Sequence, residues 1–519
     1  MEKNTFGAIL RKKRQQCGLS QYQLGMLLKV SDKAVSKWEN DLARPKSQLL
    51  YQLSTILGIT LDELFAGEKY TGKKERSCSV KEQHGCLWNK AYSNLMIRYA
   101  DKPPMEVISR FEMEKLAFMN TDMILYFDLI SKISENALRK GCPIIAEGGI
   151  GASYVAYLLG ASEVNPLPPH YYCPECKDVE FVPEAFDGWE LEKKSCNNCH
   201  SSLVSDGHNI PFEVYRHVVG KNAGFDLVIS RCLYEETEEM ILQYFGNDLM
   251  AVLNPTLEVV SNRNVSQMKT YVRQESDMQE SMGIDFATCS YDEYYNYISD
   301  KPYINLIFKD DYEKYITLEK LVNIPTTEIN FLDIKVQQAI FRGDIGEIPN
   351  FGLHSLPQLF HKFNIKNIED VLQLYGIALC ASVFSENEVN SYINRQKNLS
   401  EAITYRDDVF LYICSKMKEQ GYLETGLAYK VMDQTRKGNY YRIGMDGHIR
   451  KLLLDIGVSE QYIACLEETT YLFPKAQGII QVKHALILLW HKIHYPNEFH
   501  HVFSENTSDY GKKGNFRIR

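Results

Sequence analysis

The sequence predicts an all-α domain at the N-terminus, followed by a larger α+β body that is mostly helical and carries a small zinc knuckle. Residues 1–67 show only the periodicity of short amphipathic helices. The rest of the chain alternates long helical patterns with short strand-like pieces, and four of its cysteines form two C-x2-C pairs. At 519 residues the chain is too long for a single core, so we expect several domains.

Composition and spacing divide the chain into five segments. The polar run EKYTGKKERSCSVKEQHG, which lacks apolar periodicity, predicts a linker after the N-terminal domain. The expected segments are a domain at 1–67, a linker at 68–88, a sheet-containing part with the zinc knuckle at 89–325, a helical part at 326–505 and a polar tail at 506–519.

The charge of the chain is unevenly distributed. Residues 1–67 contain 10 Lys/Arg and 6 Asp/Glu, a balance of +4, which leaves 48 basic and 61 acidic residues, or −13, for the remainder. A basic head on an acidic body favours contact with DNA through the head. No run is long and apolar enough for a membrane span, and the first residues lack the apolar centre of a signal peptide. We therefore expect a cytoplasmic protein that does not contact membranes.

The N-terminal domain begins with three short helices. Apolar spacing predicts a first helix from Phe6 to Gly18, while Ser20 and Ser31 are typical caps of a second and a third helix. Leucines between residues 49 and 65 predict two further helices that complete a small core. The tight connection before Ser31 predicts a helix-turn-helix unit.

The third helix presents an exposed polar and basic face. The run LSQYQLGMLLKVSDKAVSKWEN, with the Arg-Pro pair that follows, resembles the XRE (phage-repressor-like) helix-turn-helix family. The resemblance implies binding of double-stranded DNA as a homodimer, in which Gln21, Lys33, Ser36 and Lys37 face bases or phosphates and Arg44 lies near the backbone. The alternative is a packing or dimerisation module without DNA binding, but the basic face favours DNA.

A glycine-rich turn, EGGIGASY, follows a short strand and opens a helix. Gly148, Gly149, Gly151 and Ser153 could offer backbone amides to a phosphate, because the missing side chains let an anion approach. A loop that needs positive φ angles for tight packing would show the same sequence.

The strongest local motif is a set of four cysteines between residues 170 and 202. Cys173 and Cys176 form one pair, and Cys196 and Cys199 form the other after a gap of 19 residues. Two such knuckles place four thiolates around one ion, which predicts a structural Zn²⁺ with no open position for catalysis. We interpret the nine other cysteines, which show no paired spacing, as buried thiols.

Several runs of the body together resemble the PolC-type DNA polymerase III alpha subunit. The similarity covers residues from about 100 to 235 and from about 325 to 503. The runs that carry it are GGIGASYVAYLLGASEVNPLPPHYYCPEC, SCNNCHSSLVSDGHNIPFE, EIPNFG, LSEAITYRDD, GLAYKVMDQTRKG and LFPKAQG. The resemblance implies a truncated polymerase body with reduced fingers and a palm next to the zinc knuckle.

The departures from that family concern catalysis. Where the family carries an Asp-Ile-Asp pair that holds two metal ions, this chain has Gly224-Phe225-Asp226. Two-metal catalysis needs bridging carboxylates, and Asp226 alone is a remnant that cannot supply them. Glu147 stands where the family has an arginine, which would repel a triphosphate. The family's third metal ligand has no assignable counterpart in a matching motif, and Asp310 or Asp311 is the candidate.

We therefore interpret the chain as a sequence-specific DNA-binding regulator fused to an inactive PolC-like body. Such a body would mimic or sense the replicative polymerase, through replisome components or ligands of its nucleotide site. One alternative is a minimal active polymerase, which would need Mg²⁺ at a site rebuilt from Asp226 and the Asp310/Asp311 region. Another is a plain repressor whose body serves dimerisation. We interpret Arg406, Asp407, Asp408, Arg436 and Lys437 as scaffold ion pairs, in preference to catalytic groups.

Overall fold

A computed structural model describes most of the chain. The described stretches, apart from a few short interruptions, are residues 5–45, 78–118, 123–216, 224–253, 266–273, 303–381 and 402–504. Contacts between Cα atoms group the chain into two compact units, Met1–Ile124 and Leu125–Arg519.

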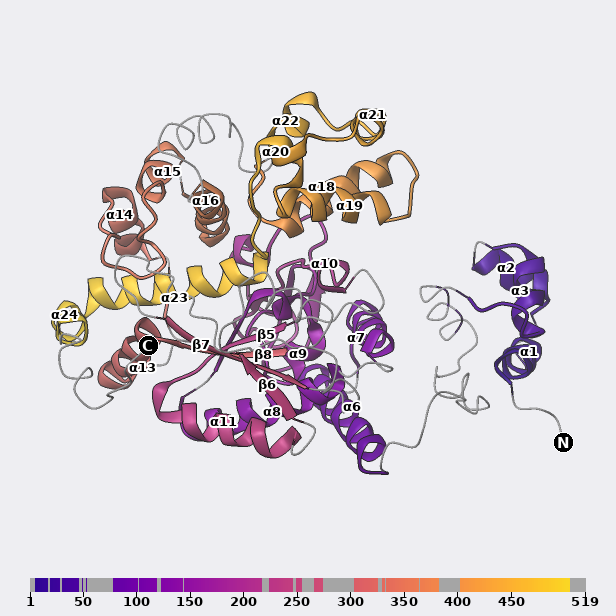
Figure 1. Cartoon of the computed structure of the whole chain (residues 1–519), viewed down its shortest axis with the longest axis horizontal. Helices are drawn as coiled ribbons and strands as arrows, with labels where there is room; N and C mark the ends of the chain where they lie inside the picture. The colour runs from indigo at the N-terminus through magenta and orange to yellow at the C-terminus, as the bar shows by residue number, and fades with distance from the viewer. Residues whose placement is uncertain are drawn as a thin grey trace. The chain divides into compact units, whose positions relative to one another are not determined.

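Three short helices form the N-terminal module (Figure 1), namely α1 (Phe6–Gln16), α2 (Gln21–Leu27) and α3 (Asp32–Glu39). The hydroxyl of Ser31 caps α3 by accepting a hydrogen bond from the backbone N–H of Ala34, as the sequence predicts. Most of the region expected to form two further helices lies outside the described residues. The small core is made of Phe6, Leu10, Leu24, Leu28, Val35, Trp38 and Leu53.

Two longer helices follow in the same unit, α6 (Cys78–Tyr99) and α7 (Met105–Phe118). Helix α6 begins inside the stretch that was expected to be a linker, so residues 78–88 are helical, whereas residues 68–77 lie outside the described part. Trp88 of α6 packs edge-on against Phe111 of α7, with ring centroids 6.2 Å apart. This apolar contact gives the last part of the expected linker a packing role.

The second unit is built around a five-stranded sheet with the order β1-β5-β8-β7-β6. Its strands are β1 (Ile145–Glu147), β5 (Gly224–Val228), β6 (Leu249–Leu253), β7 (Ser266–Arg273) and β8 (Tyr303–Lys309). Strands β5 and β8 pair parallel with each other, whereas β5 pairs antiparallel with β1 and β8 pairs antiparallel with β7, so the sheet is mixed at its centre.

The two faces of β5 have different neighbours. Phe225 is buried against α8 (Met123–Arg139), where it stacks on Tyr126 at 5.9 Å and meets Phe127 edge-on at 5.2 Å. Because side chains alternate along a strand, Asp226 points to the opposite face of the sheet. A short 3-10 helix, η1 (Gly148–Ala152), leads from β1 to α9 (Tyr154–Leu158) beside β5.

The zinc-knuckle region has a sheet of its own. Strand β2 (His170–Tyr172) lies between β3 (Val179–Phe181) and β4 (Val204–Asp206), and both pairings are antiparallel. A short 3-10 helix, η2 (Gly188–Glu190), packs beside β4. The remaining described helices of the first half are α10 (Glu213–Arg216) and α11 (Arg231–Phe245).

Helices make up the rest of the second unit. The longest is α23 (Lys475–His494), which packs against η1, α16 and α24 and runs across the body in Figure 1. No described helix is both long enough and apolar enough to cross a bilayer. The other helices are α13 (Asp310–Val322), α14 (Ile334–Arg342), α15 (Leu356–Lys362), α16 (Ile368–Ala381), α18 (Arg406–Glu419), α19 (Gly426–Arg436), α20 (Asn439–Ile443), α21 (Gly447–Asp455), α22 (Glu460–Glu468) and α24 (Pro496–Ser504).

Candidate functional site

Helix α3 carries the surface expected to contact DNA. Lys33 and Lys37 are exposed and Ser36 is half-buried, while Val35 and Trp38 face the core. The three polar residues therefore share the outer face of an eight-residue helix that is capped at its N-terminus. Short polar and cationic side chains on such a face can reach base edges and phosphates in a major groove.

The two other residues expected at the DNA hold contacts within the module. The side-chain amide of Gln21 donates to Oε2 of Glu39 at 2.7 Å. Arg44 donates to Oδ1 of Asp41 at 2.7 Å, and its guanidinium lies 4.4 Å from the ring centroid of Phe6. Gln21 and Arg44 therefore orient α2 and the segment after α3.

Glu39 is a functional residue that the sequence reasoning missed. It is buried, and Arg14 donates to both of its carboxylate oxygens, at 2.5 and 3.1 Å. Burial raises the pKa of Glu39, but hydrogen bonds from Arg14 and Gln21 outweigh it and leave the pKa below its usual value. This buried carboxylate fixes α1, α2 and α3 to one another, which sets the angle at which α3 is presented.

Both cysteine pairs lie in turns of the same construction. The backbone N–H of Lys177 donates to the carbonyl of Cys173, and that of His200 donates to the carbonyl of Cys196, each at 3.0 Å. Lys177 and His200 adopt positive φ angles of 65° and 61°, which close the turns tightly. The N–H of Asn198 donates to Sγ of Cys196 at 3.4 Å, as is suitable for a thiolate.

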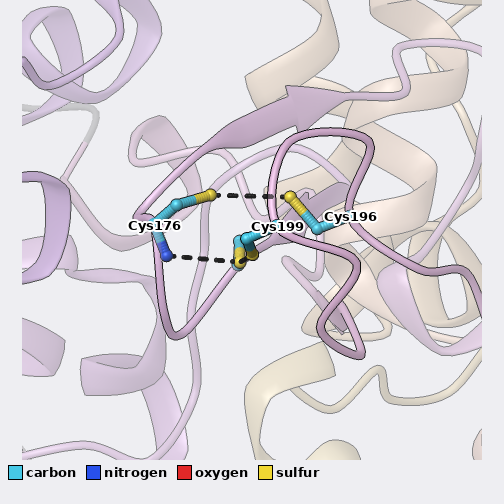
Figure 2. Close-up of side chains that lie close together, drawn as sticks. Cys176, Cys196 and Cys199 are labelled. Atoms are coloured by element: carbon cyan, nitrogen blue, oxygen red, sulfur yellow. Dashed lines mark hydrogen bonds between the residues drawn. The ribbon is translucent and has the colours of Figure 1, made fainter.

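The two turns bring their four sulfur atoms together. The Cys173 and Cys199 sulfurs lie 3.4 Å apart and the Cys176 and Cys196 sulfurs 3.5 Å apart, and all four lie within 4.8 Å of one another. Figure 2 shows the sulfurs of Cys176 and Cys196 facing each other from the two loops. Tetrahedral thiolates on Zn²⁺, with bonds of about 2.3 Å, require sulfur separations near 3.8 Å. The structure therefore brings together all four cysteines that the sequence singled out, in a cluster that can hold a metal ion.

The thiols of this cluster differ in acidity. Hydrogen bonds from Ser201 lower the pKa of Cys199 to about 6. A backbone hydrogen bond from Asp178 lowers the pKa of Cys176, but the neighbouring sulfurs outweigh it and raise the pKa to about 12. Four adjacent thiolates repel one another unless a cation lies between them, so a bound metal ion would be needed to ionise the whole set.

We call the face of the five-stranded sheet from which Asp226 projects the palm-like face, and Asp226 is the one aspartate within the described strands of this sheet. Its Cα neighbours in register are Glu147 on β1 and Asn305 on β8, so all three side chains project from the same face. The amide of Asn305 donates to Oδ1 of Asp226 at 2.5 Å. The residue in register with Asp226 is thus a neutral amide, whereas Asp310 begins α13 five positions further on, roughly 16 Å along the chain. Asp310 and Asp311 therefore lie outside the pairing register of Asp226.

Gly224 stands where the resemblance to the polymerase family implies an aspartate, and an aromatic ring lies beside it. Gly224 pairs in register with Tyr303, and a Cβ atom at Gly224 would lie 2.1 Å from Cζ of Tyr303. Among the described residues, only the four knuckle cysteines form a group of three or more ligands close enough to share a metal ion. No such group surrounds Asp226 in that part of the chain.

The glycines of the expected phosphate loop serve different purposes. Gly148 has a φ of +80°, and a Cβ atom there would lie 3.0 Å from Oδ2 of Asp226. A Cβ at Gly151 would lie 2.4 Å from Cβ of Ala476, so this glycine allows α23 to pack against the loop. Ser153 is buried and caps α9 by accepting from the N–H of Ala156 at 3.1 Å. Packing therefore explains Gly151 and Ser153 without a ligand.

Gly149 differs because a cation lies beside it. A Cβ atom at Gly149 would lie 3.3 Å from Nη2 of Arg406, which begins α18. The side chain of Arg406 is 12% exposed, its Nε is buried without a hydrogen-bond partner, and its Nε lies 3.9 Å from a carboxylate oxygen of Asp407. Burial lowers the pKa of Arg406, because the nearby carboxylate of Asp407 only partly offsets the loss of solvation of the guanidinium. The loop thus keeps a corner suited to an anion.

The other charged residues of the expected scaffold set have partners within the fold. Asp407 accepts from the backbone N–H of Lys475 at 2.7 Å, and Asp408 accepts from the hydroxyl of Thr404. Arg436 and Lys437 both pair with Asp433, each at 2.7 Å.

A buried ionic cluster joins the knuckle region to α23. Nζ of Lys475 lies 3.0 Å from Oδ2 of Asp187, with both side chains fully buried, and Oδ1 of Asp187 lies 3.0 Å from Nδ1 of His208. Glu369 and Asp408 complete the cluster, and burial raises the pKa of both, to about 6 for Asp408. The cluster holds more carboxyl groups than cations. The charge of Lys475 therefore determines how many of the carboxyl groups can stay ionised.

Two family models match the chain. Residues 10–64 match the Helix-turn-helix model, and residues 85–299 match the model described as Bacterial DNA polymerase III alpha NTPase domain. Curated relatives extend the second similarity toward the C-terminus. A protein of Thermotoga maritima named DNA polymerase III PolC-type is 26% identical over an alignment of 467 positions, which covers 78% of this chain and 33% of the relative's own length.

Other relatives with the same name give similar values. The protein of Ureaplasma parvum is 26% identical over 79% of this chain and 32% of its own length. The protein of Staphylococcus saprophyticus is 23% identical over 81% of this chain and 33% of its own length. The chain thus spans about a third of the length of the curated relatives it matches.

Proposed function

Because this chain joins a helix-turn-helix domain to a domain of the bacterial DNA polymerase III alpha family, we propose that it is a sequence-specific DNA-binding regulator whose body binds without polymerising. The body would act by mimicking or sensing the replicative polymerase. We place this activity in the cytoplasm, with the DNA that the head would bind.

The contact between Asp226 and Asn305 carries the proposal for the body. Nucleotidyl transfer by two metal ions needs carboxylates that bridge ions about 4 Å apart. The amide of Asn305 occupies the in-register position and uses an oxygen of Asp226 as its acceptor. A neutral amide binds Mg²⁺ weakly compared with a carboxylate, so the site would hold Mg²⁺ poorly.

The corner at Arg406 supports a binding role. A buried guanidinium with a free Nε beside Gly149 favours a phosphate or a similar anion, because the anion would supply the missing compensation. Glu147, which projects from the same face as Asp226, would repel the phosphate oxygens of a triphosphate. Ligands of the polymerase nucleotide site, or replisome components that recognise the body, are the partners we propose.

For the head, we propose binding to double-stranded DNA as a homodimer. One recognition helix reads only a few base pairs, so specific binding needs two half-sites about 34 Å apart. Lys33 and Lys37 would contact the DNA directly, with Ser36 between them, whereas Gln21 and Arg44 would support α3 and contact phosphates at the edge of the interface.

We further propose that the four-cysteine cluster holds one structural Zn²⁺. Four thiolates without a solvent ligand leave no open coordination position, so the ion would stabilise the fold and take no part in catalysis. Residues 170–202 contain only short strands, turns and the three-residue 3-10 helix η2, and the ion would supply much of their folding free energy.

A primer-extension assay tests the body. The zinc-loaded full chain is given a primed template, all four deoxynucleotides and either Mg²⁺ or Mn²⁺, and is compared with Asp226→Ala and Asn305→Asp. We expect no extension by the wild type or by Asp226→Ala. Extension by the wild type that Asp226→Ala abolishes would overturn the proposal and establish the alternative of a minimal active polymerase. Asn305→Asp places a carboxylate in register with Asp226. Extension by this variant alone would mean that the residue at position 305 is what limits metal binding.

A further inference from the structure

Two cysteines that show no paired spacing in the sequence meet in the fold. Sγ of Cys142 and Sγ of Cys232 lie 3.9 Å apart, although 90 positions separate them in the chain. Cys142 lies in the segment that connects α8 to β1 and is buried. Cys232 lies in the first turn of α11 and is exposed. A disulfide bond is about 2.05 Å long, so side-chain rotation over a short distance would bring the two sulfurs into bonding range.

The groups around this pair suit thiol chemistry. Nζ of Lys320 lies 3.4 Å from Sγ of Cys142, and Oγ of Ser230 lies 3.0 Å from Sγ of Cys232. Burial raises the pKa of Cys142, while the hydrogen bond with Lys320 works against that increase. The pair therefore consists of an accessible thiol and a shielded thiol that has a cation at its sulfur.

We propose that Cys142 and Cys232 form a reversible disulfide, with Cys232 as the thiol that meets the oxidant. A peroxide reacts first at Cys232: its sulfur gains a hydroxyl group to become a sulfenic acid, and the peroxide leaves as water or an alcohol. Sγ of Cys142 then attacks that sulfur and expels the hydroxyl, which takes the proton of Cys142 and leaves as water. Lys320 stabilises negative charge on Cys142 during this attack. A dithiol such as a reduced thioredoxin-like protein would reverse the bond.

The bond would cross-link the two strands that carry the palm-like face. Cys142 lies three residues before β1, and Cys232 lies four residues after Val228 of β5, which pairs with Ile145. Both strand ends lie on the same side of the β1–β5 pair, so the cross-link would fix that end of the sheet. The closed loop would contain η1, α9 and the whole knuckle region. Oxidation would thereby stabilise the region that contains Asp226 and its neighbours.

The experiment uses the zinc-loaded full chain and hydrogen peroxide at one to a few equivalents. Remaining thiols are alkylated, the protein is digested without reduction, and cross-linked peptides are identified by mass. We expect a peptide pair joined through Cys142 and Cys232, with a loss of two hydrogen atoms that dithiothreitol restores. Cys414→Ser is the matched control, because burial raises the pKa of Cys414 to about 11 and its removal should change nothing.

Two variants separate the steps. Cys142→Ala should abolish the cross-link and leave a sulfenic acid on Cys232 that dimedone traps. Lys320→Met should form the disulfide more slowly than the wild type, with the sulfenic acid accumulating in the meantime, because the exposed lysine is a positioning residue for Cys142. The proposal is overturned if the wild type keeps both thiols open to alkylation after oxidation, or if disulfides appear only among the knuckle cysteines. The identification of cross-linked peptides in the wild type does not depend on whether any variant folds.

Discussion

Replacing Lys475 by methionine should destabilise the second unit strongly, because Lys475 is the buried lysine of a cluster with three carboxyl groups. Its ammonium lies 3.0 Å from Oδ2 of Asp187, with neither side chain exposed to solvent. Removing one partner of a buried ion pair costs about 3 to 5 kcal/mol. The ammonium also lies 4.4 Å from the ring centroid of Phe186, a contact that methionine replaces in part.

The net loss should be nearer the middle of that range. Glu369 and Asp408, whose pKa values are already raised by burial, can become protonated when the lysine is absent. Asp187 has a pKa held below its usual value by His208 and Lys475 against the effect of burial, so it would keep its charge with His208 alone. We therefore expect Lys475→Met to lower the free energy of unfolding by about 4 kcal/mol.

Urea unfolding at neutral pH, followed by the fluorescence of the chain's four tryptophans, measures this loss. Trp189 lies edge-on to His208, with ring centroids 4.8 Å apart, and so reports on the cluster. A matched control on the same helix is Lys483→Met, which removes a partly exposed ion pair with Glu163 and should cost at most about 1 kcal/mol. The double variant Lys475→Met/Asp187→Asn should recover much of the single variant's loss. Equal losses for Lys475→Met and Lys483→Met would refute the reasoning.

Three further predictions concern pH, the metal and DNA. Asp408 has a folded-state pKa of about 6 against 3.8 unfolded, so its stabilising contribution is present at low pH and is lost as the pH rises through 6. The stability of Asp408→Asn relative to wild type should therefore rise by about 1 kcal/mol between roughly pH 5 and pH 7.5. Urea titrations that show no such change would contradict this prediction. Cys173→Ser should lower the zinc content from about one ion per chain and expose the knuckle region to proteolysis, whereas a metal-free protein of unchanged stability would exclude structural zinc. Lys33→Ala/Lys37→Ala should weaken binding to the DNA upstream of the protein's own gene by roughly 1 to 3 kcal/mol per base contact, as measured by fluorescence anisotropy. The charge-matched control Lys12→Ala/Lys13→Ala on α1 should weaken this binding less. If Lys33→Ala/Lys37→Ala bound as tightly as the wild type, α3 would not contact the DNA.

The features that the sequence predicts well are local in the chain. The two cysteine pairs and the Ser31 cap of α3 depend on spacings of a few residues, and both are confirmed as geometry. The resemblance to the helix-turn-helix and polymerase families is also confirmed. These signals are visible without knowledge of the tertiary fold, because the residues that form them are neighbours in sequence.

The features that it misses depend on long-range register. Asn305 contacts Asp226 across 79 positions, and only the parallel pairing of β5 with β8 selects it over Asp310. Lys475 and Asp187 are separated by almost 300 positions and carry no motif that links them. Glu39 at the end of α3 could have been suspected, since a buried acidic position in a basic helical module needs cationic partners.

The aromatic ring beside Gly224 has a consequence for substitutions at this position. A mutation of Gly224 to aspartate would place its Cβ 2.1 Å from Cζ of Tyr303, so the ring of Tyr303 would have to move before the aspartate could fit. A smaller residue at position 303 would make that room but would open a cavity next to β5. Under the proposed function, a second carboxylate at this face would therefore need coordinated changes at positions 224, 303 and 305.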